Sequence, residues 1–97
     1  MTRRSQMEIL LDILEAVAGG RQKPTHIMYR ANLSWSRLTK HLDLLSRQGL
    51  LVKAEVDGTL YRITQRGKEV LEYSNKVRSE LHARKRAFPT EVYVQNK

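Results

Sequence analysis

The sequence predicts a mainly α-helical fold that contains one small β-hairpin. Apolar residues recur at helical spacing along most of the chain. Helix-capping residues precede these stretches and glycines follow them, so the limits of each helix can be predicted as well. The pattern changes over residues 51–63, where two β-prone runs flank Asp57-Gly58, a pair typical of tight hairpin turns.

The first helix is predicted to begin after Ser5 and to stop at Gly19-Gly20. Ser5 and Glu8 form an S-x-x-E capping box, in which each side chain accepts a hydrogen bond from a backbone amide that the helix leaves unpaired. Glycine adopts the left-handed backbone conformation that ends many helices. The predicted core face of this helix consists of Ile9, Leu10, Ile13, Leu14 and Val17.

A connector or short strand is predicted over residues 21–24, and a brief second helix follows it. Thr25 is the expected cap of this helix and Asn32 its expected end. The side chains expected to point into the core are Ile27, Met28 and Tyr29. A third helix is predicted over residues 34–48, between the cap Ser34 and the stop Gly49. Its predicted buried stripe, at i, i+4 and i+7, is Leu38, Leu42 and Leu45.

The last predicted element is a long helix that Thr64 caps and that continues to about residue 86. Phe88-Pro89 breaks it, because the residue before a proline disfavours the helical conformation. Residues 87–97 are expected to form a flexible tail.

Residues 1–86 are therefore expected to form a single domain in the order helix, helix, helix, hairpin, helix. Two short helices that meet at a tight turn, followed by a hairpin, indicate a winged helix-turn-helix. The wing would be the pair of strands predicted over residues 51–56 and 59–63. The last helix is the addition to this pattern, so the predicted architecture is a winged helix-turn-helix with a long C-terminal helix.

The charge balance points to a polyanionic partner. The chain has 18 Lys and Arg residues against 10 Asp and Glu, a formal net charge of +8 and a pI of about 10.2. Residues 21–49 contain six of the basic residues and one acid. Nucleic acid is the leading candidate. A membrane-surface protein would instead need an unpartnered apolar helix face, which the pattern does not suggest.

The composition also narrows the cellular setting. The chain has no cysteine, which excludes disulfides and thiolate metal sites. No apolar run approaches the ~18 residues of a membrane span, and the N-terminus has no signal-peptide pattern. We expect a cytoplasmic protein, associated with the nucleoid if its partner is DNA.

The sequence resembles a known family over about residues 8–72. The most specific pieces are THIMYRANLS at 25–34, LDLL at 42–45, GLL at 49–51, and YRIT at 61–64 followed by Gly67. Together they resemble a group of small archaeal winged-helix proteins. This group includes the Sulfolobus ten-kilodalton chromatin-associated DNA-binding proteins and many predicted archaeal transcriptional regulators. The resemblance implies DNA binding without catalysis, and often a dimer formed by the C-terminal helix as an antiparallel coiled coil.

The third helix, over residues 34–48, is the predicted recognition helix, because the second helix of a helix-turn-helix enters the major groove of double-stranded DNA. With the leucine stripe inward, Ser36, Lys40, Asp43 and Arg47 point outward. The predicted base contacts come from the early part of the helix and are Ser36, Arg37, Thr39 and Lys40. The predicted phosphate contacts are Arg47, Arg30, Arg3 and Arg4.

The predicted wing has a positioning role at most. Its tip carries Glu55 and Asp57, which phosphates repel, so insertion of the tip into the minor groove is not expected. Lys53 and Arg62, on the two strands, are expected to reach the DNA backbone.

Three further residues near the recognition helix have predicted roles. Asp43 is expected to pair with Arg47 at i+4 and to orient it, rather than to accept from a cytosine amino group. Trp35 is expected to pack against the corner of the helix-turn-helix, with stacking on DNA as the alternative. Tyr29 and Tyr61 are expected to fill the core with their hydroxyls at the surface.

Catalysis is not expected, and neither are a cofactor or a metal. His26, His41 and His82 lack a metal-ligand spacing, and His41 is expected at the edge of the core. Residues 19–23 lack the pattern of a phosphate-binding loop and are interpreted as a helix stop.

The final helix suggests a homodimer. A four-three spacing of the coiled-coil type is formed by Val70, Ser74, Val77, Leu81, Arg84 and Phe88, although two of these positions are polar. The alternative is a helix that packs on its own domain up to about Val77 and then projects. The competing functions are a protein-interaction adaptor without DNA readout and, third, RNA binding.

Overall fold

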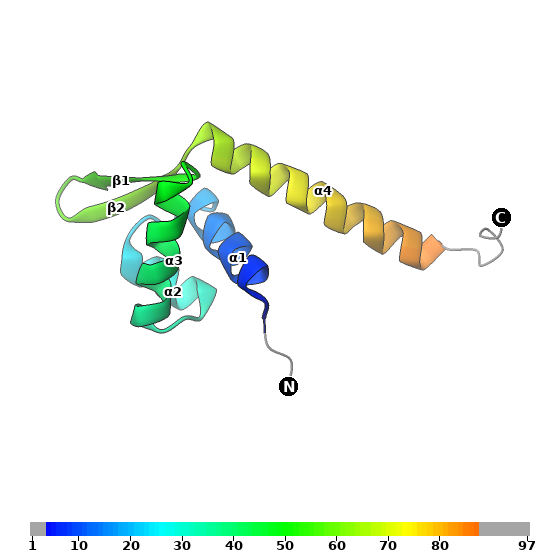
Figure 1. The fold of residues 1–97 in the computed structure, drawn as a ribbon, viewed down its shortest axis with the longest axis horizontal. Helices are drawn as coiled ribbons and strands as arrows, with labels where there is room; N and C mark the ends of the chain where they lie inside the picture. Colours follow the sequence, from blue (N-terminus) through cyan, green and yellow to red (C-terminus); the bar gives the residue numbers. More distant parts are fainter. Residues whose placement is uncertain (1–3, 88–97) are drawn as a thin grey trace.

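The computed structural model describes residues 4–87, with side chains to His82. The elements are α1 (Gln6–Ala18), α2 (Pro24–Ala31), α3 (Trp35–Arg47), β1 (Leu51–Glu55), β2 (Thr59–Ile63) and α4 (Gln65–Ala87). Figure 1 shows the three short helices gathered together, the hairpin beside α3, and α4 leading away from them. The predicted order of elements is confirmed, and the fold is a mainly helical winged helix-turn-helix. The predicted tail, apart from Ala87 at the end of α4, lies outside the described residues.

The capping box of α1 forms as predicted. The backbone N–H of Glu8 donates to Ser5 Oγ at 3.1 Å, and the backbone N–H of Ser5 donates to Glu8 Oε1 at 2.9 Å. The chain then leaves the helix through Gly19 and Gly20, of which Gly20 has a φ of 106°. Two orphan amides are therefore satisfied where the sequence indicated a helix start.

The start of α2 differs from the prediction. The helix begins at Pro24, with Lys23 as a cap that makes no side-chain hydrogen bond, so Thr25 is not the cap. Proline suits the first helical position because its missing N–H has no partner there in any helix. Asn32 ends α2 in the left-handed conformation, with a φ of 56°, as predicted.

The prediction that Tyr29 points inward is wrong. Ile27 and Ala31, one turn apart, set the buried face of α2. Tyr29 follows Ile27 by two residues, which at about 100° per residue turns its side chain to the opposite face. It is 76% exposed.

The third helix matches its prediction closely. Ser34 Oγ accepts a hydrogen bond from the backbone N–H of Arg37 at 3.3 Å. The buried side chains of α3 are Leu38, His41, Leu42 and Leu45. They include the whole predicted stripe, and His41 lies at the edge of the core as expected. Gly49, with a φ of 77°, follows the end of the helix.

The hairpin pairs Leu51 with Ile63 at its base and Glu55 with Thr59 at its tip. The first strand ends one residue earlier than predicted, because Val56 belongs to the turn and its N–H donates to the carbonyl of Gly58 at 2.8 Å. Asp57 and Gly58 both have positive φ, 53° and 102°, as the predicted turn requires.

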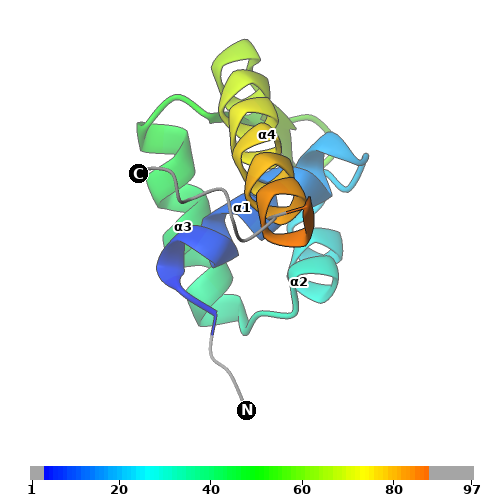
Figure 2. The same cartoon turned by 90° about the vertical axis from the view of Figure 1, so that its right-hand side faces the viewer.

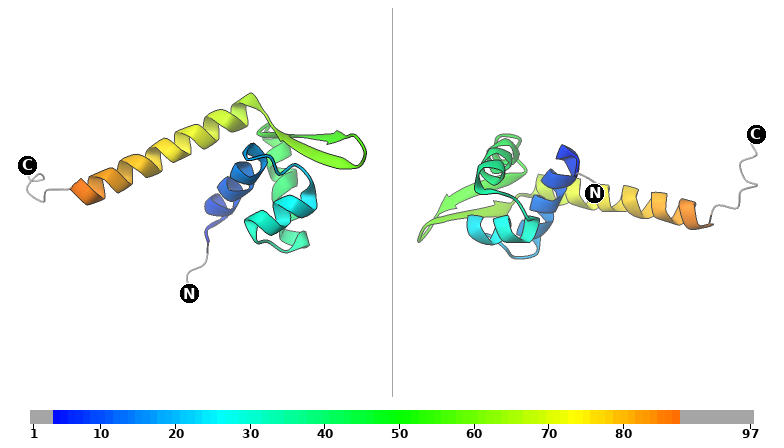
Figure 3. Two further views of the ribbon diagram at one scale, coloured as in Figure 1. Left: turned by 180° about the vertical axis from the view of Figure 1, so that it is seen from behind. Right: turned by 90° about the horizontal axis from the view of Figure 1, so that it is seen from below.

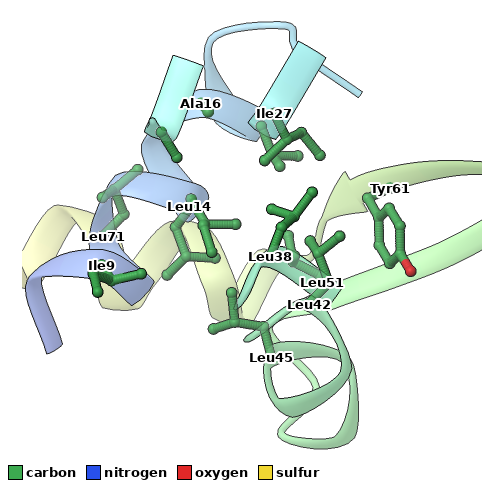
Figure 4. Packing of buried hydrophobic residues seen from close by; sticks show 13 residues of the cluster. Ile9, Leu14, Ala16, Ile27, Leu38, Leu42, Leu45, Leu51, Tyr61 and Leu71 are labelled. Atoms are coloured by element: carbon green, nitrogen blue, oxygen red, sulfur yellow. The ribbon is translucent and has the colours of Figure 1, made fainter. Parts of the chain in front are cut away.

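One core joins the first three helices, the hairpin and the start of α4 (Figure 4). The buried apolar residues are Ile9, Ile13, Leu14, Ala16, Val17, Ile27, Ala31, Leu38, Leu42, Leu45, Leu51, Tyr61 and Leu71. Tyr61 is 9% exposed, which confirms its predicted place. The connector before α2 also lies along the sheet, since the N–H of Tyr61 donates to the carbonyl of Gln22 at 2.9 Å.

The start of α4 is fastened to the end of α3. Thr64 Oγ1 accepts from the N–H of Gly67 at 3.0 Å, which confirms the predicted cap. The same hydroxyl lies 2.7 Å from the carbonyl oxygen of Gly49, to which it donates. Beyond this point the helix leaves the domain (Figures 1 and 3), and Leu71 is its buried apolar side chain among the described residues. Within residues 4–87, no helix combines the length and the hydropathy that a membrane span needs.

Candidate nucleic-acid interface

The outward side of α3 forms an exposed polar ridge. It consists of Ser36, Lys40, Asp43 and Arg47, which are exposed because the leucine stripe occupies the opposite side of the helix. Arg37 and Thr39 flank the ridge and are also exposed, with the Thr39 hydroxyl donating to the carbonyl of Ser36 at 3.1 Å. The five residues of this helix that are predicted to contact DNA therefore all lie at the surface. They are Ser36, Arg37, Thr39, Lys40 and Arg47.

Asp43 and Arg47 form the predicted ion pair. Arg47 Nη2 lies 3.0 Å from Asp43 Oδ2, across one turn of the helix, and both side chains are largely exposed. The pair holds the guanidinium of Arg47 along the ridge.

A cleft of about 350 Å³ separates α3 from the wing. Its residues on α3 include Trp35, Thr39 and Asp43, and those on the hairpin include Lys53 and Tyr61. Trp35, expected to pack against the corner of the helix-turn-helix, is 52% exposed at the start of α3 and lines this cleft together with Pro24 of α2.

The wing presents its two predicted cations on opposite faces. Lys53 pairs in register with Tyr61, and Arg62 pairs with Val52, so strand alternation separates the two side chains. Lys53 lines the cleft beside α3, and its Nζ lies 3.8 Å from Glu55 Oε2. Arg62 is exposed on the other face.

On the other flank of α3, a second hollow has a volume of about 290 Å³. It is lined by Arg4, Gln6, Ile9, Arg37, Lys40 and His41. No sequence pattern indicates that the start of α1 and these residues of α3 meet, because the pairing depends on how two helices pack. The contributions of Gln6 and His41 were therefore missed.

Arg4, predicted as a phosphate contact, is already engaged within the protein. Its guanidinium donates to Asp12 Oδ2 at 2.8 Å, to the carbonyl of Ala31 at 2.7 Å and to the carbonyl of Asn32 at 3.0 Å. It thereby ties the segment before α1 to the turn between α2 and α3. Arg3 lies outside the described residues.

Arg30 belongs to a different surface from the ridge. It lines a shallow hollow of about 430 Å³ together with Arg21, His26 and Tyr29. Figure 2 shows α2 and α3 on different sides of the domain. Arg30 lines neither the cleft between α3 and the wing nor the hollow between α1 and α3. Among the described residues, no group of three His, Asp or Glu side chains is arranged to hold a metal ion.

Comparison with known proteins agrees with this geometry. The chain belongs to a winged helix-turn-helix family, whose sequence model matches residues 3–82. The uncharacterized protein MJ0287 from Methanocaldococcus jannaschii is 35% identical over 68 residues, which are 70% of this chain and 67% of that protein.

Two solved structures extend the comparison. Sso10a-2, a DNA-binding protein from Sulfolobus solfataricus, is similar with a TM-score of 0.66 and 27% identity, over 97% of this chain and 99% of that chain. The transcriptional regulator BldR from the same organism has a TM-score of 0.70 at 22% identity, over 91% of this chain and 63% of that chain. The likeness to BldR concerns the fold alone.

Proposed function

We propose that this chain binds double-stranded DNA, as a transcriptional regulator or a chromatin-associated protein, with α3 in the major groove. The observation that carries the proposal is the exposed ridge of α3, which is bordered by basic side chains on both flanks. The net charge of +8 favours the same partner. The likeness to Sso10a-2, described as a DNA-binding protein, supports it further.

The proposed contacts divide by position. Ser36, Arg37, Thr39 and Lys40 come from the early part of α3 and would meet base edges or the neighbouring backbone. Arg47, Lys53, Arg62 and Arg30 would meet phosphates. Lys53 has the strongest support among the residues outside α3, because it lines the cleft beside the recognition helix. Arg30 has the weakest, because it lines a separate hollow.

We also propose that α4 joins two copies of the chain. Its exposed apolar side chains form one stripe, with Val70 37%, Tyr73 71%, Val77 43% and Leu81 61% exposed. An apolar stripe that stays in water contributes no burial free energy, whereas a second copy of the chain would bury it. Tyr73 extends the seam expected from the sequence. A DNA-binding dimer of this kind would act in the cytoplasm, at the nucleoid.

The test is a titration of a fluorescently labelled duplex with the wild-type protein and with the double variant Lys40→Glu, Arg47→Glu. We expect sub-micromolar binding at low salt for the wild type and a loss of at least about a hundredfold for the variant, because two cations of the proposed interface become anions. The double variant Lys68→Glu, Lys76→Glu makes the same charge change at two exposed positions of α4, away from the ridge, and should weaken binding much less. Equal binding by all three proteins would contradict the proposed interface.

A second candidate function is an interaction adaptor, which the exposed stripe of α4 favours. In that case the wild-type protein would bind no duplex even at the lowest salt, and the α4 surface alone would determine its associations. Competition between duplex DNA and duplex RNA separates DNA binding from an RNA-binding role.

A further inference from the structure

The hollow between the start of α1 and α3 has the composition of an anion site. Arg37 and Lys40 each bring a positive charge to it, and Arg4 brings a guanidinium that is paired with Asp12 at 2.8 Å. The described lining itself includes no carboxylate. Gln6 adds an amide. A volume of about 290 Å³ is ample for one phosphate group.

His41 is the buried titratable residue of this lining. The residue is 9% exposed, and its Nδ1 lies 2.6 Å from the carbonyl oxygen of Arg37. A carbonyl only accepts hydrogen bonds, so Nδ1 carries a proton. Nε2 makes no hydrogen bond to the described residues and remains available to the hollow.

The charged groups that face His41 come from two elements. From the segment before α1 the facing charge is Arg4, whose guanidinium is fixed by Asp12 and by two backbone carbonyls. From α3 the facing charges are Arg37 and Lys40. A second proton on the imidazole would add a further positive charge here, which is favourable once an anion occupies the hollow.

The hollow also lies where a DNA strand is expected under the proposed function. With the ridge of α3 in the major groove, the phosphates of the two strands border the helix on its two flanks. Lys53 of the wing lies on one flank and the hollow on the other. The two sites would therefore hold opposite walls of the groove.

We propose that this hollow seats one phosphate of the DNA backbone and that doubly protonated His41 donates to it through Nε2. The proposal rests on the proposed function and deepens it. It assigns Arg37 to the backbone rather than to a base. A phosphate bound in this way favours the doubly protonated form of His41, so affinity for DNA increases as the pH falls.

The test compares duplex binding between pH 8.0 and pH 5.5 at constant ionic strength. For the wild type we expect affinity to rise about tenfold across this range, as for a hydrogen bond from a charged donor. His41→Asn can still donate to the Arg37 carbonyl but lacks an atom at the Nε2 position, so its affinity should vary little with pH. His41→Gln supplies a neutral donor near Nε2 and should bind with an intermediate, pH-independent affinity.

His26→Asn is the matched control, because His26 is exposed on α2 and outside this hollow. It should keep the wild-type pH dependence. If His41→Asn keeps that dependence, or if His26→Asn loses it, the proposal is wrong. Thermal unfolding of each variant at pH 7 verifies that the proteins compared are folded.

Inorganic phosphate provides a test on the wild-type protein that does not require DNA. In nitrogen-15 NMR spectra, added phosphate should shift Nε2 of His41 and leave His26 unchanged. No shift at His41 would overturn the phosphate site even if the duplex binds. A shift without duplex binding would instead retain the anion site and refute the proposed function.

Discussion

At the residue scale, the ridge of α3 combines cations with one carboxylate whose role is electrostatic. Asp43 lies one turn before Arg47 and pairs with it at 3.0 Å. An exposed i,i+4 pair of this kind adds about 0.3–0.5 kcal/mol to stability, which is small for a domain. Under the proposed function, its negative charge among the cations of α3 has the larger effect, because it would oppose phosphate binding wherever no base donor meets it.

Replacement of Asp43 by Asn should therefore change affinity more than stability. We expect duplex binding to tighten a fewfold at low salt, with the free energy of unfolding changed by less than about 0.5 kcal/mol. Fluorescence anisotropy titrations check the affinity, and thermal unfolding checks the stability. Weaker binding by Asp43→Asn would mean that the carboxylate contacts a base or that Arg47 depends on it for orientation.

Gly67 occupies a position that has no room for a side chain. It lies buried in the first turn of α4, and a Cβ there would lie 2.7 Å from Ile63 Cγ1 and closer still to the carbonyl oxygen of Leu50. The backbone of α4 can approach the base of the wing this closely because glycine has no side chain. The angle at which α4 leaves the domain is set at this contact.

Gly67→Ala should destabilise the protein although alanine favours helices. Relief of the overlap with the Leu50 carbonyl requires a backbone shift, which costs about 1–3 kcal/mol, against about 1 kcal/mol gained in helix propensity. Thermal unfolding should show a lower Tm than the wild type. Lys68→Ala, at the exposed neighbouring position, should leave the Tm nearly unchanged; an equal Tm for both variants would contradict the packing argument.

At the element scale, α4 has two distinct sides. Gly67 and Leu71 are buried against the domain, whereas Val70, Val77 and Leu81 lie about 80° away around the helix and remain exposed. The helix thus packs on its own domain through one side only. The other apolar side is left for a partner.

Val77→Glu should convert a dimer into a monomer. A carboxylate in the buried seam would cost at least about 2 kcal/mol, so the dimer dissociation constant should rise more than tenfold. Light scattering behind a sizing column measures the mass. Ser79→Glu introduces the same charge on the opposite side of α4 and should leave the mass unchanged; a monomeric wild type would refute the seam.

At the scale of the whole molecule, the basic residues together produce a positive electrostatic potential. The net charge of +8 attracts a polyanion from a distance, and under the proposed function the two flanks of α3 would determine how the duplex docks. The acidic tip of the wing, with Glu55 and Asp57, favours a docked orientation that keeps it away from phosphates. Affinity should then depend on phosphate contacts spread along α3 and the wing.

Salt dependence checks this distribution. Each phosphate contact contributes about −0.9 to the slope of log affinity against log salt concentration. Lys53→Gln should make the slope shallower by about that amount while changing affinity similarly for all duplex sequences. An unchanged slope would remove the wing from the interface.

The elements and most of their limits could be predicted because they depend on local chemistry. Ser5 and Ser34 cap helices through bonds to amides three residues away, and Asp57-Gly58 adopts the positive φ angles of its turn. The errors also had local causes: Pro24 displaced Thr25 at the start of α2, and helix periodicity turned Tyr29 outward.

The sequence by itself determined a winged helix-turn-helix with an exposed polar ridge on its third helix, because periodicity decides which side of a helix is buried. Only the tertiary structure decided which residues from separate elements meet. The hollow that joins Arg4 and Gln6 to His41, and the separation of Arg30 from the ridge, arise from the packing angles of α1 and α2 against α3. These angles follow from side-chain fit across the core, which spacing along a chain does not encode.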